Sequence, residues 1–441
     1  MKKFFGLFLA ALAAFALCSC SGQASAQSAE LGSEPVTITF WHSASDEAGV
    51  LVDKYVKEFN ETNDKQITVE AVYQGQYSDA ATLMKTVISA ENYSELPNIM
   101  QLDATGKVDY YNSGRALTID EAQEQFGETI TDGVFDTVLA NWQYSGAQLG
   151  MPFATSTTIT YCNMDLLAQA GWSECPTSFT DIIKLSADMK AAGIEAAAYG
   201  TVPNTPTLAN WLGQMGSYLV NNKNGTDGMA TALDCVENGA LRDFLAAWKE
   251  MYDAGAVENT SLSTNQFVAG EVAVFTSSSS NLASVLSKVD GAFEVGVANF
   301  LRVNDEVPYG ATASGSCLVL FKDDENELKE QAAWEFLKYM TSDAVQCDFA
   351  AGTGYTVAKP SETWDAFIAD GHEQYDTGRQ QLSITSPEMR SVTVGPSVDF
   401  YNAIMSGVGA MLENGTDPDT AAAELADTLQ GLLDNWARMN G

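Results

Sequence analysis

Residues suited to covalent or metal chemistry are scarce in this chain of 441 residues. His42 and His372 are its only histidines, so a histidine-built zinc site or a Ser-His-Asp triad has little support. The 58 acidic residues include no motif that singles out two carboxylates facing one bond, as a glycoside hydrolase requires. We therefore expect no enzyme, no metal and no cofactor, and we keep a secreted glycoside hydrolase as the alternative from another class.

Side chains suited to noncovalent binding of hydroxyl groups lie at the ends of predicted strands. Asp103 follows the apolar run at 98–102, and four serines at 277–280 follow the run at 270–275. Carboxylates and hydroxyls form hydrogen bonds to polyols, and ligands of open α/β sheets lie at the carboxyl ends of the strands. The serines have a structural alternative, because they could cap a helix that begins near Asn281.

The elements that must position these residues alternate between strand and helix. Strand-like runs at 36–41, 66–73 and 98–102 flank helical patterns that begin at Ser45 and span 79–90. This β-α-β-α-β order is typical of an α/β fold with a parallel sheet wrapped by helices. Later segments continue the alternation: an extended run at 150–161, helices at 178–193 and 241–252, a turn at 221–225, a strand at 270–275, and a C-terminal helix from Asp417 with an apolar stripe of Leu425, Leu429, Leu432 and Trp436.

The N-terminus has the pattern of a lipoprotein export signal. Lys2 and Lys3 precede a short apolar run at 4–17, which ends in small residues before Cys20. We expect a signal peptide at 1–19, lipid on Cys20 and a flexible tether at 20–35, which would hold the protein at the outer face of the cell membrane. The alternative is an ordinary secretory signal cut after Ala24 or Ala26. No later segment is long and apolar enough to cross a membrane.

Size, charge and cysteine content narrow the remaining possibilities. About 405 residues follow the tether, enough for two lobes. Without the signal, 20 basic residues stand against 58 acidic ones, a charge that repels nucleic acid and anionic lipid headgroups. The cysteines after the signal have no C-x-x-C spacing, and because their number is odd, at least one is expected to be unpaired and buried. They are Cys162, Cys175, Cys235, Cys317 and Cys347.

Five short motifs, in this order, resemble the family 1 extracellular solute-binding proteins of ABC importers, and most closely the glycerol-3-phosphate-binding subgroup. They are TFWH at 39–42, PNI at 97–99, MPF at 151–153, FVAG at 267–270 and TGY at 353–355. The resemblance implies a two-lobe Venus-flytrap fold of discontinuous lobes joined by a hinge, at 36–148 plus 310–358 and 150–308 plus 360–441. It also implies a monomer that captures a small ligand and delivers it to an ABC permease.

The resemblance also carries over onto particular positions. The residues that match the family's ligand contacts are Tyr77, Asp103, Ser156, Ser278, Ser279, Ser280, Tyr355, and Ser314 or Gly315. Tyrosine faces pack on the C–H surface of a sugar. Each tyrosine has an alternative as an ordinary residue at a lobe edge. Trp211, selected for its ring, is either a core residue or a platform on which a sugar stacks.

The sequence departs from the subgroup where a phosphate would bind. The family has an arginine near the position of Thr393, whereas the nearest arginine here is Arg390. The subgroup's tryptophans are absent around 199–205, and Asp103 is shorter than the family's glutamate. These differences favour a neutral sugar or short oligosaccharide. Glycerol-3-phosphate or a glycerophosphodiester is the alternative ligand.

Overall fold

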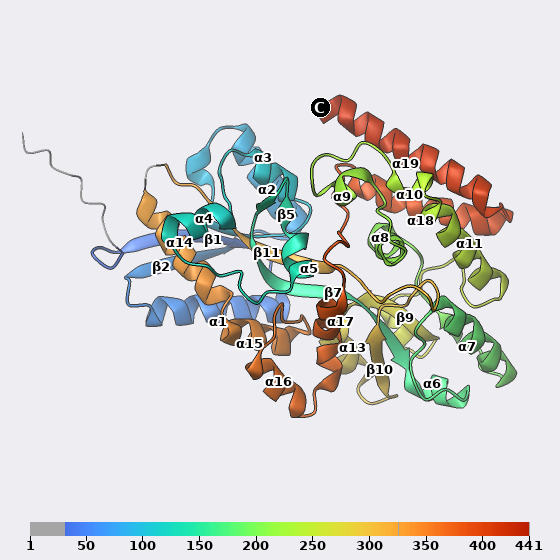
Figure 1. The fold of residues 1–441 in the computed structure, drawn as a ribbon. Coiled ribbons are helices and arrows are strands. Elements are labelled where there is room, and N and C mark those ends of the chain that lie inside the picture. Colours follow the sequence, from blue (N-terminus) through green and yellow to red (C-terminus); the bar gives the residue numbers. More distant parts are fainter. Residues whose placement is uncertain (1–30, 325, 441) are drawn as a thin grey trace, which may run out of the picture.

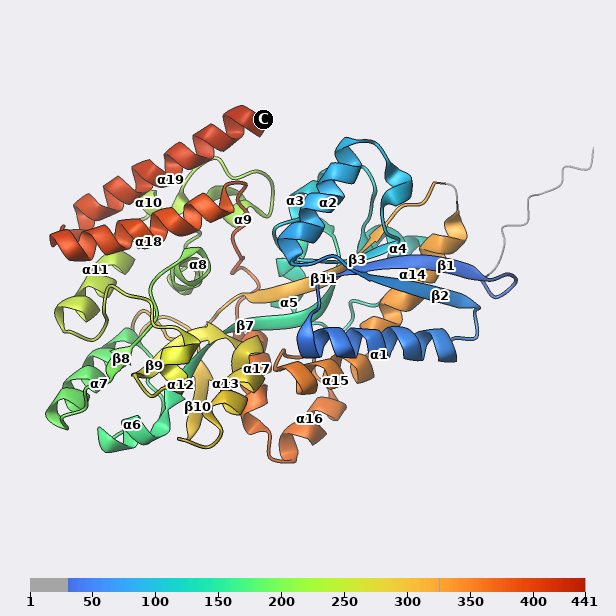
Figure 2. The same ribbon diagram turned by 180° about the vertical axis from the view of Figure 1, so that it is seen from behind.

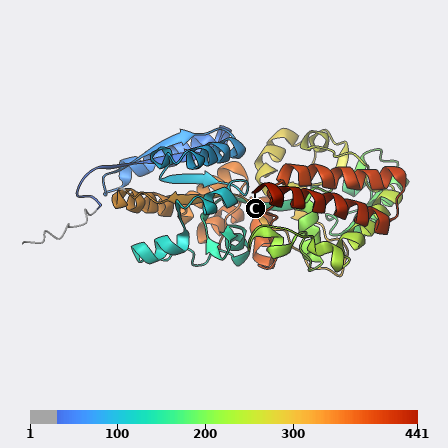
Figure 3. The same ribbon diagram turned by 90° about the horizontal axis from the view of Figure 1, so that it is seen from above.

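The computed structural model describes residues 31–324 and 326–440. The predicted signal peptide and Cys20 lie outside the described residues, as does most of the tether. The described chain forms two bodies that lie side by side, which Figure 1 shows from the front and Figure 3 from above. We call them the first and second lobes, after the order in which the chain enters them.

The first lobe is built mainly from the N-terminal elements and a later return of the chain. Its elements are β1 (Val36–His42), α1 (Asp46–Thr62), β2 (Ile67–Tyr73), α2 (Tyr77–Ser89), η1 (Tyr93–Glu95), β3 (Ile99–Leu102), α3 (Lys107–Asn112), β4 (Ala116–Leu117), α4 (Ile119–Phe126), α5 (Asp136–Asn141), β5 (Gln143–Tyr144), β6 (Ala147–Gln148), β11 (Ala313–Phe321), α14 (Glu327–Met340) and α15 (Asp343–Thr353).

The second lobe holds the middle of the chain and its C-terminal helices (Figure 2). Its elements are β7 (Met151–Asn163), α6 (Met164–Gln169), α7 (Phe179–Ala191), β8 (Ala197–Tyr199), α8 (Thr205–Gln214), α9 (Asn221–Gly225), α10 (Asp234–Glu237), α11 (Ala240–Asp253), α12 (Thr264–Val268), β9 (Val272–Ser278), η2 (Ser279–Asn281), α13 (Leu282–Val289), β10 (Val295–Asn299), α17 (Thr377–Ile384), α18 (Ser397–Asn414) and α19 (Pro418–Asn440); α16 (Glu362–Ala369) and η3 (Glu373–Asp376) precede α17.

One mixed sheet runs through both lobes. Its strand order is β2-β1-β3-β11-β7-β9-β8, with β4 paired to β11 and β10 paired to β7. The strands β1, β2 and β3 are parallel, as the β-α-β-α-β pattern predicts. The long strand β7 pairs with β11 through its first half and with β9 and β10 through its second half. It therefore passes directly from one lobe into the other.

Each lobe has its own apolar core. In the first lobe, α1 and α14 pack on the sheet through residues such as Phe59 and Phe336, whose rings meet edge to face at 5.1 Å. In the second lobe, α7, α8, α11, α18 and α19 enclose a larger cluster. Burial of apolar surface of this kind is the main stabilising term of each lobe. The predicted bounds of the lobes stay a prediction. One of these bounds, at 358–360, lies just before α16. The buried Trp364 of α16 packs with Cys347 of α15 in the first lobe.

The local predictions agree closely with the observed elements. The predicted turn at 221–225 is three consecutive left-handed residues, with φ of 55°, 50° and 60° at Asn222, Lys223 and Asn224. In the C-terminal helix, Leu425 and Leu429 are buried as predicted, but Leu433 takes the buried place expected for Leu432. Leu433 lies in the core and Leu432 packs against it from outside, because contacts with other helices, which periodicity does not specify, decide which side of the stripe is covered.

The cysteines and the helix lengths add two further findings. Cys162 and Cys175 form a disulfide, and Cys235, Cys317 and Cys347 are free and buried. The expectation of at least one buried unpaired cysteine is thereby confirmed. Within residues 31–324 and 326–440, no helix combines the length and the apolar character that a membrane crossing needs.

Candidate functional site

The strands at the junction of the lobes bring most of the predicted ligand residues near one another. Ser156 on β7 and Ser314 on β11 are register partners, and their Oγ atoms lie 2.9 Å apart. Asp103 directly follows β3, the neighbour of β11, and Ser278 ends β9, the neighbour of β7. These residues come from four adjacent strands, so the sheet order, which crosses between the lobes here, gathers them.

Two half-buried tyrosines and a serine form the centre of this group. Tyr77 begins α2 in the first lobe, and Tyr355 follows α15. Burial raises the pKa of Tyr77 above its usual value, with the neighbouring Tyr355 as the next cause. Burial also raises the pKa of Tyr355, against hydrogen bonds from the Tyr77 and Ser280 side chains that lower it. Both phenols therefore stay protonated at neutral pH and can donate hydrogen bonds to a ligand.

A buried glutamine, which sequence reasoning did not select, holds Tyr77 in place. Gln101 on β3 is 1 % exposed, and its Nε2 donates to the Tyr77 hydroxyl at 3.1 Å and to Ser316 Oγ at 2.9 Å. Its Oε1 accepts a hydrogen bond from the backbone N–H of Ser43 at 3.0 Å. The available signal in the sequence was an amide, Gln101, among the apolar residues at 99–102.

Asp103 lies in the group of predicted ligand residues and also accepts hydrogen bonds from the nearby Thr105. Its Oδ1 accepts hydrogen bonds from the Thr105 N–H at 3.0 Å and the Thr105 hydroxyl at 2.5 Å. Burial is the largest effect on this carboxyl and raises its pKa, although the bonds from Thr105 oppose the shift. The side chain thus shapes the turn into α3. For this reason Asp103 has a structural role beside any role in binding.

The serines at 278–280 differ in their roles. Ser279 is 3 % exposed, and its Oγ accepts a hydrogen bond from the Thr157 N–H at 3.2 Å. Ser278 Oγ caps the short helix η2 by accepting from the Ser280 N–H, and its distance to Ser280 Oγ is 2.9 Å. The capping alternative thus describes Ser278, while Ser280 is the serine that meets Tyr355.

The bulge at Gly315 explains why a glycine occurs among these polar residues. Gly315 has φ of +96°, and the register of β11 against β7 shifts after it. A Cβ at this position would lie 1.9 Å from the carbonyl oxygen of Ala154. Only glycine permits so close an approach of the two strands in this conformation.

Trp211 does not belong to the group, which corrects its candidacy as a sugar platform. The side chain is 0 % exposed and lies in the core of the second lobe. Its ring stacks on Phe244 at 5.3 Å and on Phe300 at 5.0 Å, and its Nε1 donates to the carbonyl oxygen of Leu301. The indole is therefore enclosed by the protein itself.

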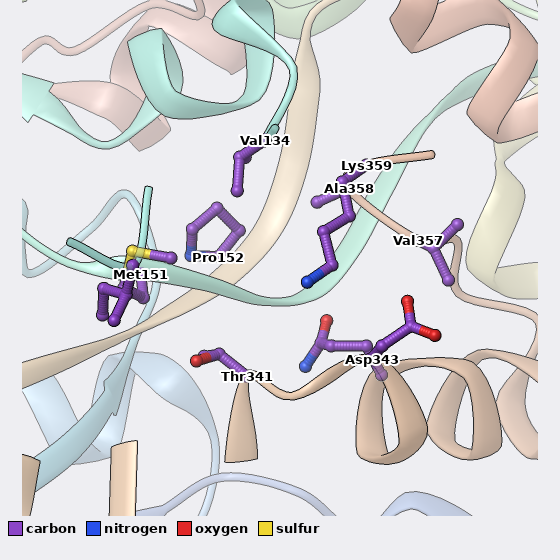
Figure 4. A pocket seen from close by; sticks show the side chains of 10 residues that line it. Val134, Met151, Pro152, Thr341, Asp343, Val357, Ala358 and Lys359 are labelled. Atoms are coloured by element: carbon purple, nitrogen blue, oxygen red, sulfur yellow. The ribbon is translucent and has the colours of Figure 1, made fainter. Parts of the chain in front are cut away.

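A small cavity near the junction is not the predicted site. It holds about 20 Å³, room for one water, and lies between the start of β7, helix α15 and the segment at 357–359. Figure 4 shows Met151, Pro152, Asp343 and Lys359 around it. None of the ten residues that line it belongs to the predicted ligand set. Nor does the described part of the chain hold a cluster of His, Cys, Asp or Glu suited to a metal ion.

Comparison with known proteins adds the decisive observation. Residues 54–373 match the family described as "Bacterial extracellular solute-binding protein". The chain belongs to this family. A curated relative, the sn-glycerol-3-phosphate-binding periplasmic protein of Salmonella typhimurium, is 25 % identical over 327 residues, which cover 72 % of this chain and 73 % of the relative. The protein from Yersinia pseudotuberculosis with the same name is 23 % identical over 325 residues.

Solved structures share the two-lobe fold of periplasmic binding proteins. The sugar-binding protein MalE from Xanthomonas citri matches with a TM-score of 0.75 at 20 % identity, over 92 % of this chain and 100 % of that one. UgpB from Mycobacterium tuberculosis, solved with glycerophosphocholine, matches with a TM-score of 0.72 at 18 % identity over the same shares. The predicted fold class is thereby confirmed, and the family match over residues 54–373 confirms the assignment to extracellular solute-binding proteins.

Proposed function

We propose that this protein captures a carbohydrate or polyol between its lobes and delivers it to the transmembrane subunits of an ABC importer. The observation that carries this proposal is the meeting of polar side chains of both lobes at the junction, where Ser156 Oγ on β7 lies 2.9 Å from Ser314 Oγ on β11 and Gln101 holds the Tyr77 hydroxyl. Half-buried phenols and hydroxyls offer hydrogen bonds to ligand hydroxyls and flat faces to its C–H groups. Some relatives are named for glycerol-3-phosphate and others for sugars, which supports a small polyhydroxylated ligand.

The mechanism we propose is closure of the lobes on the ligand. Ligand contacts to both lobes stabilise a closed form over an open one, and the permease accepts the closed form. The predicted crossover segments near 148–152, 308–312 and 357–361 serve as the hinge. They separate lobes bounded as the sequence predicts, at 36–148 plus 310–358 and 150–308 plus 360–441. Small-angle scattering of the protein should show a smaller radius of gyration at saturating ligand, and an unchanged radius would count against closure.

The proposed location is the outer face of the cell membrane, with the protein as a monomer held by lipid on Cys20. The motif before Cys20 supports this part of the proposal. Mass spectrometry of the native N-terminus tests it. An unlipidated protein that starts at Gln27 would rule the anchor out.

The binding site is tested with one screen and four variants. Thermal shift of the parent against mono- and oligosaccharides, polyols and glycerophosphodiesters finds a ligand, because ligand at 100 times its Kd adds about 2.7 kcal/mol of stability. Calorimetric titration then compares Tyr77→Phe, Tyr355→Phe and Asp103→Asn with the parent. Tyr401→Phe is the matched control, since Tyr401 lies on α18 and is 41 % exposed.

Each variant at the junction should weaken binding in proportion to the bond that it removes. Loss of a neutral hydroxyl should lower affinity about 2- to 10-fold, and loss of the carboxylate charge at Asp103 roughly 10- to 150-fold. Asparagine is preferred to alanine at Asp103 because its oxygen still accepts the bonds from Thr105. If all three variants bind like the parent and like Tyr401→Phe, the ligand lies elsewhere. Turnover of the ligand would favour the glycoside hydrolase instead.

A further inference from the structure

A glutamine inside an otherwise apolar strand uses its side-chain amide entirely within the protein. Gln101 lies on β3 and is 1 % exposed. Its Nε2 donates to the Tyr77 hydroxyl at 3.1 Å and to Ser316 Oγ at 2.9 Å, and its Oε1 accepts from the Ser43 N–H at 3.0 Å. An amide nitrogen carries two protons, so both donors of Gln101 are committed. A buried amide that is satisfied in this way is held in one orientation.

A backbone N–H decides which way this amide faces. Ser43 directly follows β1, whose backbone pairs with β2 and β3, so the sheet sets the position of the Ser43 N–H. A backbone N–H can only donate, and the amide atom that faces it must therefore be the oxygen of Gln101. The opposite orientation would bring two donors together at this point. The nitrogen of Gln101 consequently faces Tyr77 and Ser316.

The Ser316 hydroxyl agrees with this direction. Ser316 is fully buried, and its Oγ donates to the carbonyl oxygen of Phe153 at 2.9 Å. A carbonyl oxygen only accepts, so the single proton of Ser316 points to Phe153, and the oxygen of Ser316 receives an N–H of Gln101. Each hydrogen bond around Gln101 therefore runs from a defined donor to a defined acceptor.

The same reasoning applies to the phenol of Tyr77. Its oxygen receives an N–H of Gln101, so its one proton points away from Gln101. Burial raises the pKa of both Tyr77 and Tyr355, and the hydrogen bond between the two side chains raises the pKa of Tyr77 and lowers that of Tyr355. These directions are those of a bond that Tyr77 donates and Tyr355 accepts. The proton of Tyr355 is then the one that this chain of hydrogen bonds leaves for a ligand.

We propose that Gln101 is a positioning residue that fixes the direction of hydrogen bonding through the pair of Tyr77 and Tyr355, so that the site presents a phenol proton to its ligand. The ligand then needs an acceptor at this point. A hydroxyl, ether or carboxylate oxygen fits, whereas an ammonium group, which only donates, does not. This inference rests on the proposed function, because it takes the ligand to lie against Tyr355. It adds a selectivity for oxygen over nitrogen at one position of the ligand.

The direction of the bond at Tyr77 can be measured without a ligand. The Raman doublet of tyrosine differs between phenols that accept and phenols that only donate, and the difference between a protein and its Tyr77→Phe counterpart isolates the signal of Tyr77. Gln101→Met removes the amide donor with a side chain of similar size, so this signal should shift toward that of a phenol that only donates. No shift, or a shift in the opposite direction, would overturn the assigned role of Gln101.

The matched control is Gln346→Met. Gln346 is a second buried glutamine of the first lobe, 8 % exposed, and its Nε2 donates to the carbonyl oxygen of Met340 at 2.9 Å. Its replacement removes a buried amide without touching Tyr77, so the Tyr77 signal should stay as in the parent. An equal shift in Gln346→Met would mean that the change reports a general loss of packing, and would also count against Gln101.

Paired probes test the selectivity for an acceptor. Calorimetric titration compares glucose with glucosamine, and glycerol with serinol, in which an amine replaces the central hydroxyl. The parent should bind at least one hydroxyl probe at least tenfold more tightly than its amino counterpart. Gln101→Met should bind that probe about 3- to 10-fold more weakly than the parent does, while Gln346→Met should behave like the parent.

Gln101→Glu reverses the bond and provides its own rescue. At about pH 8 its carboxylate can only accept, so Tyr77 should donate to it and the preference for the hydroxyl probe should fall. At about pH 5 burial favours the protonated carboxyl, which donates as the amide does, so the preference should return. The parent should show no such return on acidification. A preference that Gln101→Met and Gln101→Glu both retain, or equal affinity of the parent for a probe and its amino counterpart, would overturn the selectivity.

The two kinds of measurement separate this inference from the proposed function. If the parent binds none of the four probes, the proposed function loses support for these ligands, while the Raman shift still decides the role of Gln101. If a sugar binds but the Raman signal of Tyr77 does not depend on Gln101, the proposed function stands and the role of Gln101 is overturned.

Discussion

Replacement of the buried Lys107 by methionine should raise the stability of the ligand-free protein at neutral pH. Lys107, the first residue of α3, is 1 % exposed, and its Nζ donates to the carbonyl oxygen of Asn141 at 3.2 Å. The pKa of a lysine is about 10.4 in an unfolded chain, whereas burial lowers the pKa of Lys107 to about 8 in the folded protein. The folded state therefore holds this proton less tightly than the unfolded state. Below pH 8 the ammonium is charged in both the folded and the unfolded state. The full free-energy cost of burying this charge therefore lowers the stability of the folded protein.

The magnitude follows from the difference between the two pKa values. A difference of about 2.5 units corresponds to roughly 3 kcal/mol, and loss of the hydrogen bond to Asn141 offsets about 1 kcal/mol of that gain. The free energy of unfolding of Lys107→Met should thus exceed that of the parent by about 2 kcal/mol at pH 7. As the pH rises from 8 toward 10, the unfolded state binds more protons than the folded state, so the parent gains stability and the advantage of the variant shrinks.

Urea unfolding of both proteins at several values between pH 6.5 and 9.5 measures this difference. Buried thiols and phenols also titrate near the upper end, but they are present in both proteins, so the subtraction largely removes them. The control is Lys57→Met on α1, whose parent side chain is 75 % exposed, and it should show no such trend. A difference that stays constant with pH, or a variant less stable than the parent by several kcal/mol, would refute the account of Lys107 as an unpaired buried cation.

Two further predictions concern the second lobe. A Cβ on Gly395 would lie 1.9 Å from the ring of Trp436 on α19, so Gly395→Ala should cost about 1 to 3 kcal/mol in urea unfolding. A Cβ on Gly431 of α19 would meet no atom within 4 Å, so Gly431→Ala should instead raise the free energy of unfolding by about 0.5 to 1 kcal/mol. Stability changes of the same sign in both variants would contradict this packing. The Cys162–Cys175 disulfide closes a separation of 13 residues, which predicts a loss of about 3 kcal/mol on reduction. A reductant should lower the Tm of the parent but not of Cys175→Ser, and equal shifts would argue against the bond.

The strands and helices could be predicted because local patterns decide them. At α1, Asp46 and Glu47 in the first turn and buried residues on one face specify a helix without reference to the rest of the chain. At β1 to β3, β-branched runs separated by helices specify parallel pairing. The prediction of Trp211 as a sugar platform failed because residues distant in the sequence pack against its ring. Trp211 is a core residue because Phe244 and Phe300, both distant in the sequence, stack on its ring.

By itself, the sequence determined the α/β alternation, the two-lobe family fold and the polar residues at the strand ends, because each depends on neighbours in the chain or on short motifs. Only the tertiary structure decided which of those residues meet. It paired Cys162 with Cys175, set Gln101 behind Tyr77, and brought Arg390 near Lys107. The physical reason is that burial of a side chain depends on packing between distant segments, whereas helical or strand periodicity is a local property of the sequence. Lys107, which the sequence would allow as an ordinary surface residue, becomes a buried charge only because the packed chain encloses it.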